Sequence, residues 1–218
     1  MEYILIILCL IFMSLYLYYC EVKESKHAGL YKTLASLCFV ILAFINYSGN
    51  RNLINMLFLI GMCFDALGDI LLGIQSDTLA DKLFLAGTGG FMVGHVFYLL
   101  AFFSSYRVSP LVFIVIGVTL GLIANSIIQK NCKLTKTLKI CSVIYTQLIF
   151  NIAILSLGVF LNDMNLRNAL ILISTTFFCT SDCILIACDF YKKEKWMHPV
   201  YLTLYYIAQI IMAFALKL

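Results

Sequence analysis

Eight long apolar segments, separated by short polar ones, organise this chain of 218 residues. Each segment has about the 20 mostly apolar residues that an α-helix needs to cross a bilayer. Hydrophobic residues make up 63% of the chain and charged residues 12%, which is about half the charge of a soluble domain. The pattern predicts an all-α polytopic membrane protein with eight transmembrane helices at about 3–20, 28–47, 53–74, 83–104, 109–128, 136–160, 168–189 and 199–217.

We expect one transmembrane domain over residues 1–218, because no polar stretch is long enough for a separate soluble domain. The first segment is interpreted as a retained helix. It carries Glu2 where a signal peptide has basic residues, and no Ala-x-Ala-like cleavage site follows it.

Basic residues are distributed unevenly between the two sets of loops. Cytoplasmic loops are the basic ones, so we expect both termini to face away from the cytoplasm, in the cell membrane if the source is bacterial. The net charge of +4 arises in these loops and favours anionic headgroups, so we expect membrane lipids and no nucleic acid as partners. One side has four basic residues, Arg51, Arg107, Arg167 and Lys217, and the other has eleven: Lys23, Lys26, Lys32, Lys82, Lys130, Lys133, Lys136, Lys139, Lys192, Lys193 and Lys195.

Two aspartates interrupt apolar helices in similar surroundings. Asp69 lies in Leu67-Gly-Asp-Ile-Leu-Leu-Gly73, and Asp182 lies in Thr180-Ser-Asp-Cys-Ile-Leu-Ile-Ala187. An ionised carboxylate in hydrocarbon costs roughly 3 kcal/mol or more, so such a residue is a functional candidate. Both helices are expected to run inward, which puts both aspartates at a similar depth in the cytoplasmic half. The sequence therefore predicts one site, built from two helices and opening towards the cytoplasm.

Other polar residues are candidates to line this site. Asp65 lies one helical turn before Asp69, and Lys32 begins the second helix on the cytoplasmic side, where it either snorkels or contacts a phosphate. His95 and Tyr98 share a helix face, and so do Tyr205 and Gln209. His95 and Gln209 are either site residues or interhelical hydrogen-bonding residues.

Small and polar residues elsewhere have a structural interpretation. Gly87, Gly90 and Gly94 lie on one helix face, where small residues let helices approach closely. Gln147 and Asn151, beside Tyr145, either line a cavity or hold helices together. The nine cysteines are interpreted as packing residues, because most fall in apolar segments and none form a C-x-x-C pair.

A weak four-plus-four internal repeat is also visible. The spacing from Asp69 to His95 along the chain is nearly the same as the spacing from Asp182 to Gln209. Helices three and four are then equivalent to helices seven and eight, as in parallel repeats of other membrane proteins.

At these residues the chain resembles the YhhN-type lysoplasmalogenase family of integral membrane enzymes. The family pattern combines a small residue plus Asp, an F-x-x-(G/A)-H-x-x-Y helix, a later Ser-Asp before aliphatic residues, and a final Y-Y-x-A-Q. A second acid before Gly-Asp departs from the pattern and leaves open which acid reacts. The matching residues are Gly68-Asp69, Phe91 to Phe102 with Gly94-His95 and Tyr98, Ser181-Asp182 before Ile184-Leu185, Tyr205 to Gln209 and, less specifically, Lys32.

The resemblance implies an ether-bond hydrolase of lipid metabolism. Its substrate is a lysophospholipid, a lysoplasmalogen, and its products are a fatty aldehyde and glycerophosphoethanolamine or glycerophosphocholine. A vinyl ether is labile to acid, so the resemblance implies that Asp69 and Asp182 act as a proton donor and a carboxylate partner. Lys32 is then expected to contact the phosphate. Asp65, His95, Tyr98, Tyr205 and Gln209 are expected to line the substrate site.

Three other classes remain open, one of them a purely structural or receptor-like role that no sequence feature positively supports. Buried carboxylates also serve membrane transporters and ion-coupled carriers, although no helix here is obviously broken by proline. A zinc hydrolase is less favoured, because only His27, His95 and His198 are present and two of them lie at loop edges. We therefore expect no metal and no cofactor, and the sequence leaves the oligomeric state open.

Overall fold

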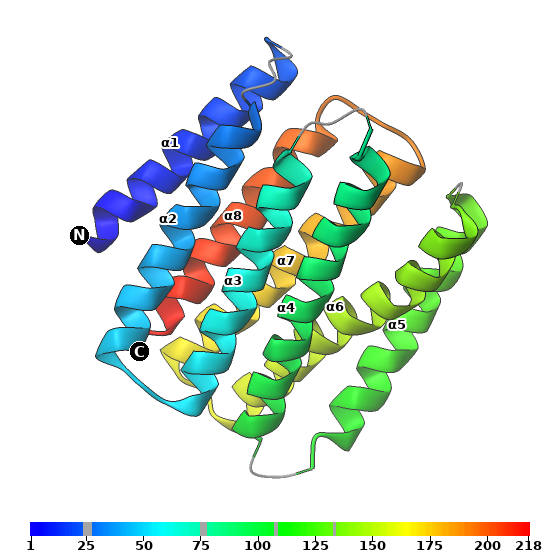
Figure 1. The fold of residues 1–218 in the computed structure, drawn as a ribbon. Helices are drawn as coiled ribbons and strands as arrows, with labels where there is room; N and C mark the ends of the chain where they lie inside the picture. Colours follow the sequence, from blue (N-terminus) through cyan, green and yellow to red (C-terminus); the bar gives the residue numbers. More distant parts are fainter. Residues whose placement is uncertain (24–27, 75–77, 107–108, 133) are drawn as a thin grey trace. The chain divides into compact units, whose positions relative to one another are not determined.

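The computed structural model describes residues 1–23, 28–74, 78–106, 109–132 and 134–218. Among these residues it contains eight α-helices and no strand, and all eight are long and apolar enough to cross a membrane. Lys26, His27, Arg107 and Lys133, which entered the arguments above, lie outside the described residues. The helices are α1 Glu2–Glu21, α2 Ala28–Gly49, α3 Leu53–Gly73, α4 Ala80–Ser105, α5 Leu111–Asn131, α6 Lys136–Asn162, α7 Leu166–Phe190 and α8 Met197–Ala215 (Figure 1).

The predicted all-α class and the eight helices are confirmed, and each helix begins and ends close to its predicted position. The third helix runs without a break through Asp65 and Asp69. The orientation of the chain in the membrane stays a prediction, as does the single domain.

The chain forms two compact units, which are described separately. The first unit comprises Met1–Phe97 with Met212–Leu218, and the second comprises Tyr98–Ile211. In the first unit, α1 packs on α2 and α2 packs on α3. In the second unit, α5 packs on α6 and α6 packs on α7. Each of these four pairs joins helices that are consecutive in the sequence.

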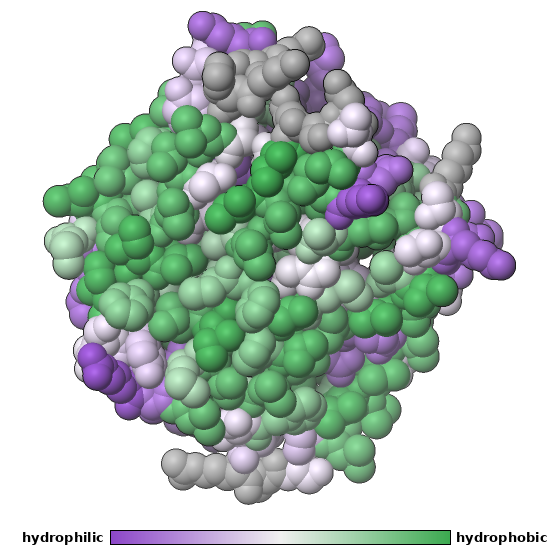
Figure 2. All heavy atoms as spheres, in the orientation of Figure 1, coloured by the Kyte–Doolittle hydropathy of each residue, from purple (hydrophilic) through white to green (hydrophobic). Residues whose placement is uncertain are grey.

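Many large apolar side chains on the helices are exposed. Leu111, Val112 and Val115 of α5 are all more than half exposed. Figure 2 shows hydrophobic residues over most of the visible face, with hydrophilic residues mainly towards its rim. Such a surface is unfavourable in water and favourable in a bilayer, where lipid tails cover it.

Glycines bring α3 and α4 into close contact, as their spacing predicted. A Cβ atom at Gly90 would lie 3.3 Å from the Cα of Gly68. At Gly94 it would lie 2.6 Å from Oδ1 of Asp65 and 2.8 Å from the carbonyl oxygen of Gly61. The helices approach this closely because no side chain stands between their backbones.

Polar side chains hold α6 against α5 in the second unit. A Cβ atom at Gly117 would lie 2.7 Å from Oδ1 of Asn151, and one at Gly121 would lie 2.8 Å from Nε2 of Gln147. Gln147 also donates to the carbonyl oxygen of Val118 at 3.4 Å. Of the two interpretations left open for Gln147 and Asn151, these contacts support the one in which they hold helices together.

The last turn of α8 is fixed in the first unit. Asn46 of α2 donates to the carbonyl oxygen of Ala213 at 2.9 Å, and Asn55 of α3 donates to that of Leu216 at 3.1 Å. Carbonyl groups at the end of a helix lack partners within that helix, so the two asparagines satisfy them inside the bundle.

Candidate active site

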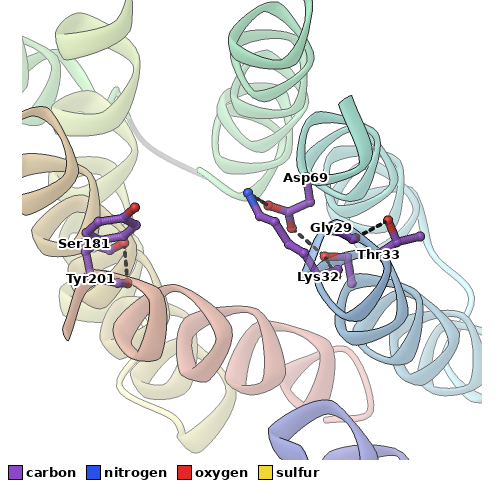
Figure 3. A network of polar contacts seen from close by, with 7 residues as sticks. Gly29, Lys32, Thr33, Asp69, Ser181 and Tyr201 are labelled. Atoms are coloured by element: carbon purple, nitrogen blue, oxygen red, sulfur yellow. Dashed lines mark hydrogen bonds and ion pairs between the residues drawn. The ribbon is translucent and has the colours of Figure 1, made fainter. Parts of the chain in front are cut away.

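A buried ion pair joins α2 and α3 in the first unit. Nζ of Lys32 lies 3.2 Å from Oδ1 of Asp69, and the two side chains are only 11% and 2% exposed. Figure 3 shows the Lys32 side chain reaching across to the Asp69 carboxylate. The pair lies within two predicted membrane spans, where a lone charge would be costly. Each charge is balanced by the other.

A serine supplies a second donor to Asp69. Oγ of Ser36 lies 2.6 Å from Oδ2 of Asp69 and 3.1 Å from the carbonyl oxygen of Lys32. A hydroxyl carries one hydrogen, and 2.6 Å is the spacing of a hydroxyl that donates to a carboxylate. Ser36 therefore donates to Asp69, and both carboxylate oxygens have a donor.

Local backbone packing sets the height at which Lys32 meets Asp69. Gly29, at the start of α2, lies against Gly73, at the end of α3, so closely that a Cβ atom at Gly29 would overlap the Gly73 carbonyl oxygen. Lys32 follows Gly29, and Asp69 precedes Gly73, by about one helical turn in each case. Ser36 lies one further turn along α2 and therefore on the same face as Lys32.

Asp182 has its own hydroxyl partner in the second unit. The Tyr145 hydroxyl of α6 donates to Oδ2 of Asp182 at 2.7 Å, and Asp182 is 5% exposed. The preceding residue, Ser181, donates to the carbonyl oxygen of Tyr201 at 2.8 Å and so links α7 to α8 (Figure 3). These two bonds fix the α7 backbone and one carboxyl oxygen at this level.

Asp65 and His95 are fully enclosed in the first unit. Asp65 is 0% exposed and packs against the backbone of Gly94, as described above. Nδ1 of His95 lies 2.5 Å from the carbonyl oxygen of Phe91. A carbonyl oxygen only accepts, so Nδ1 carries the hydrogen, and Nε2 of a neutral ring is left as an acceptor.

The remaining predicted site residues belong to the second unit, and all are buried. Tyr98 is 3% exposed, Tyr205 is 6% and Gln209 is 1%. The ring of Tyr205 packs edge-on against Phe178 of α7, with 5.4 Å between the ring centroids. Tyr205 is thereby held at the α7–α8 contact, one turn from the level of Asp182 on α7.

The structure brings Lys32 and Asp69 together, which the sequence did not predict: Lys32 was expected either to snorkel or to contact a phosphate. Asp65 and His95 lie in the same unit as this pair. Asp182, Tyr98, Tyr205 and Gln209 lie in the other unit, so a shared site for the two aspartates stays a prediction. The lack of a metal and a cofactor also stays a prediction.

Two hydroxyl groups beside the aspartates were not among the predicted site residues. Ser36 belongs to no motif, and its only signal is its position one turn after Lys32 on an apolar helix. Tyr145 was noted for its position near Gln147 and Asn151 but was given no role. Interhelical hydrogen bonds depend on helix rotation, which sequence spacing alone does not give.

Comparison with known proteins identifies one family. The sequence model of the YhhN family matches residues 27–216, which is most of the chain. No curated protein and no solved structure matches the chain. The matched range contains α2 to α8 and therefore Lys32, both aspartates and their hydroxyl partners.

Proposed function

The chain belongs to the YhhN family, and we propose that it is a lysoplasmalogenase, an enzyme that hydrolyses the vinyl ether bond of 1-alkenyl lysophospholipids. The products are a fatty aldehyde and glycerophosphoethanolamine or glycerophosphocholine. One observation carries the proposal: a carboxylate, Asp69, is kept inside a membrane span by a buried ammonium group and a hydroxyl. Such an arrangement is costly in hydrocarbon and is typical of functional sites.

The reaction starts with proton transfer to carbon. The carboxyl group of Asp182 gives its proton to the β-carbon of the vinyl ether, and the ether oxygen shares the resulting positive charge as an oxocarbenium ion. A carboxylate near this cation stabilises it. Asp69 takes this role, because its carboxylate charge is balanced by the Lys32 ammonium group at 3.2 Å and hydrogen-bonded by the Ser36 hydroxyl at 2.6 Å.

Water then completes the hydrolysis. It attacks the oxocarbenium carbon, and Asp69 accepts the proton that the water loses, which gives a hemiacetal. Asp69 returns this proton to the glycerol oxygen while Asp182 takes the hydroxyl proton of the hemiacetal. The carbon–oxygen bond breaks, the aldehyde leaves, and both acids regain their starting states.

This sequence of steps gives Lys32 a different role from the phosphate contact expected from the family resemblance. Its ammonium group balances the negative charge of the Asp69 carboxylate between turnovers. It also stays beside the Asp69 carboxylate, 3.2 Å from Oδ1, while the proton arrives and leaves.

Incubation of the purified protein with matched alkenyl- and acyl-lysophospholipids tests the proposal. We expect free aldehyde from the alkenyl lipid and no free fatty acid from the acyl lipid, because only the vinyl ether is activated by protonation at carbon. Release of fatty acid would indicate an esterase and refute the mechanism. Uptake of an ion or solute into proteoliposomes, without aldehyde release, would favour a carrier that uses the same buried charges.

A further inference from the structure

The two halves of the chain, α1–α4 and α5–α8, repeat the same pair of hydrogen bonds at the start of a helix. The residue numbers in the two halves differ by a constant offset. Oδ1 of Asn52 accepts from the backbone N–H of Asn55, and the Asn55 side chain donates to the carbonyl oxygen of Asn50, at 2.8 Å and 2.9 Å. Asn165, Asn168 and Asp163 make the same two bonds at the start of α7, both at 2.8 Å. Each residue number in the second set is that in the first plus 113.

The same offset relates the helices on either side of these hydrogen bonds, α2 to α6 and α3 to α7. It converts the end of α2 at Gly49 into the end of α6 at Asn162, and the start of α3 at Leu53 into the start of α7 at Leu166. It also converts Asp69 into Asp182. The two aspartates are therefore at equivalent positions, each at the same spacing from an equivalent asparagine, Asn55 or Asn168.

The offset converts Lys32 into Tyr145. Within the first unit Lys32 contacts Asp69 at 3.2 Å, and within the second unit Tyr145 contacts Asp182 at 2.7 Å. The same position in each half thus supplies a partner to the aspartate, but the partner is an ammonium group in one half and a phenol in the other. The counterpart of Ser36 is Ile149, whose side chain has no hydroxyl group.

We propose that Tyr145 is a positioning residue that presents Asp182 as the proton donor of the reaction. Position 145 is the counterpart of the position at which Lys32 pairs with Asp69. A phenol orients the carboxyl group through a hydrogen bond at 2.7 Å and adds no positive charge that would favour loss of its proton. An ammonium group at the same position favours loss of that proton. The difference between Lys32 and Tyr145 thereby helps to separate the two acids into a donor and a carboxylate.

This inference rests on the proposed function, and a structural interpretation competes with it. In that interpretation the Tyr145 hydroxyl only joins α6 to α7, as interhelical hydrogen bonds commonly do in membranes. The two interpretations differ in what they predict for the chemical state of Asp182 and for kcat.

Tyr145→Phe is the first test, with Tyr106→Phe as the matched control. Both variants lose one phenolic hydroxyl in the second unit, and the Tyr106 hydroxyl donates to a backbone oxygen of α6, that of Leu155, at 2.8 Å. We expect Tyr145→Phe to lower kcat for aldehyde release about 10- to 100-fold with little change in KM. Tyr106→Phe should keep the kcat of the unmodified protein. Equal kcat values in the two variants would overturn the inference.

Infrared difference spectroscopy gives a second test that does not require activity. Subtracting the spectrum of Asp182→Asn assigns the band of this side chain, and we expect the C=O stretch of a protonated carboxyl group. Tyr145→Phe should shift that band, and Tyr145→Lys should replace it with carboxylate bands and abolish aldehyde release. Carboxylate bands from Asp182 in the unmodified protein would refute the inference. A protonated band without aldehyde release by the unmodified protein would instead refute the proposed function.

Discussion

Replacing Lys32 by methionine tests the buried ion pair most directly. At 3.2 Å and an effective dielectric constant of about 20, the attraction between the two charges is ~5 kcal/mol. The side chains are nearly enclosed, so solvent screens little of this attraction. Methionine keeps much of the length and apolar stem of lysine but leaves the Asp69 charge uncompensated. We expect the free energy of unfolding to fall by about 3–5 kcal/mol.

Two further variants separate charge from packing. Lys32→Met combined with Asp69→Asn removes both charges, so its stability should return to within about 2 kcal/mol of the unmodified protein. Lys217→Met is the matched control, because Lys217 pairs with Glu2 at 2.9 Å but is 52% exposed. Breaking this open pair should cost less than about 1 kcal/mol.

The free energies come from titration of the detergent-solubilised variants with SDS, followed by circular dichroism. Equal losses in Lys32→Met and Lys217→Met, or a double variant as unstable as the single one, would contradict the reasoning. Aldehyde release should be lost in Lys32→Met and should stay lost in the double variant, because restored stability does not restore the carboxylate.

Three other predictions follow from the same contacts. Asp69→Asn and Asp182→Asn should each abolish aldehyde release while the purified protein still elutes as a folded species on size-exclusion chromatography; full activity in either would exclude the two-acid mechanism. Gly29→Ala should prevent recovery of folded protein, because its methyl group overlaps the α3 backbone, whereas Gly49→Ala enters open space and should be recovered normally. Asn168→Ala should lower the unfolding free energy by about 1–2 kcal/mol in the same SDS titration, through loss of its side-chain hydrogen bond to the Asp163 carbonyl oxygen before α7; no change would show that this bond is dispensable.

Hydropathy was sufficient to predict the helices but not how they pair. Apolar length alone located all eight, because a span must satisfy its backbone hydrogen bonds within itself. It also identified Asp69, since a carboxylate stands out among leucines and isoleucines. The pairing of Asp69 with Lys32 was missed, because it depends on the height at which α2 passes α3. That height is set by a glycine contact, between Gly29 and Gly73, which carries no polar signal.

The internal repeat could also be recognised only in part from the sequence, and the hydrogen bonds were needed to define it. Aligning His95 with Gln209 gave slightly unequal spacings from the two aspartates, which do not fit one offset. The asparagine caps fit one offset without a gap, and their role became clear only from the hydrogen bonds of Asn55 and Asn168. Asparagines in loops are common in any sequence, so their spacing is not evidence of a repeat until their hydrogen bonds are known.

A duplicated acid is by itself a poor catalyst for this chemistry. Two carboxyl groups in matching surroundings release their protons with similar ease, whereas vinyl ether hydrolysis needs one acid that holds a proton and one that does not. The difference therefore has to come from the neighbours of the acids. The contacts at positions 32 and 145 supply this difference. An ammonium group stabilises the charge of one carboxylate, and a phenol orients the other carboxyl group without adding a positive charge beside it. Exchange of the neighbour at this position is a small change by which two similar halves acquire different chemical roles.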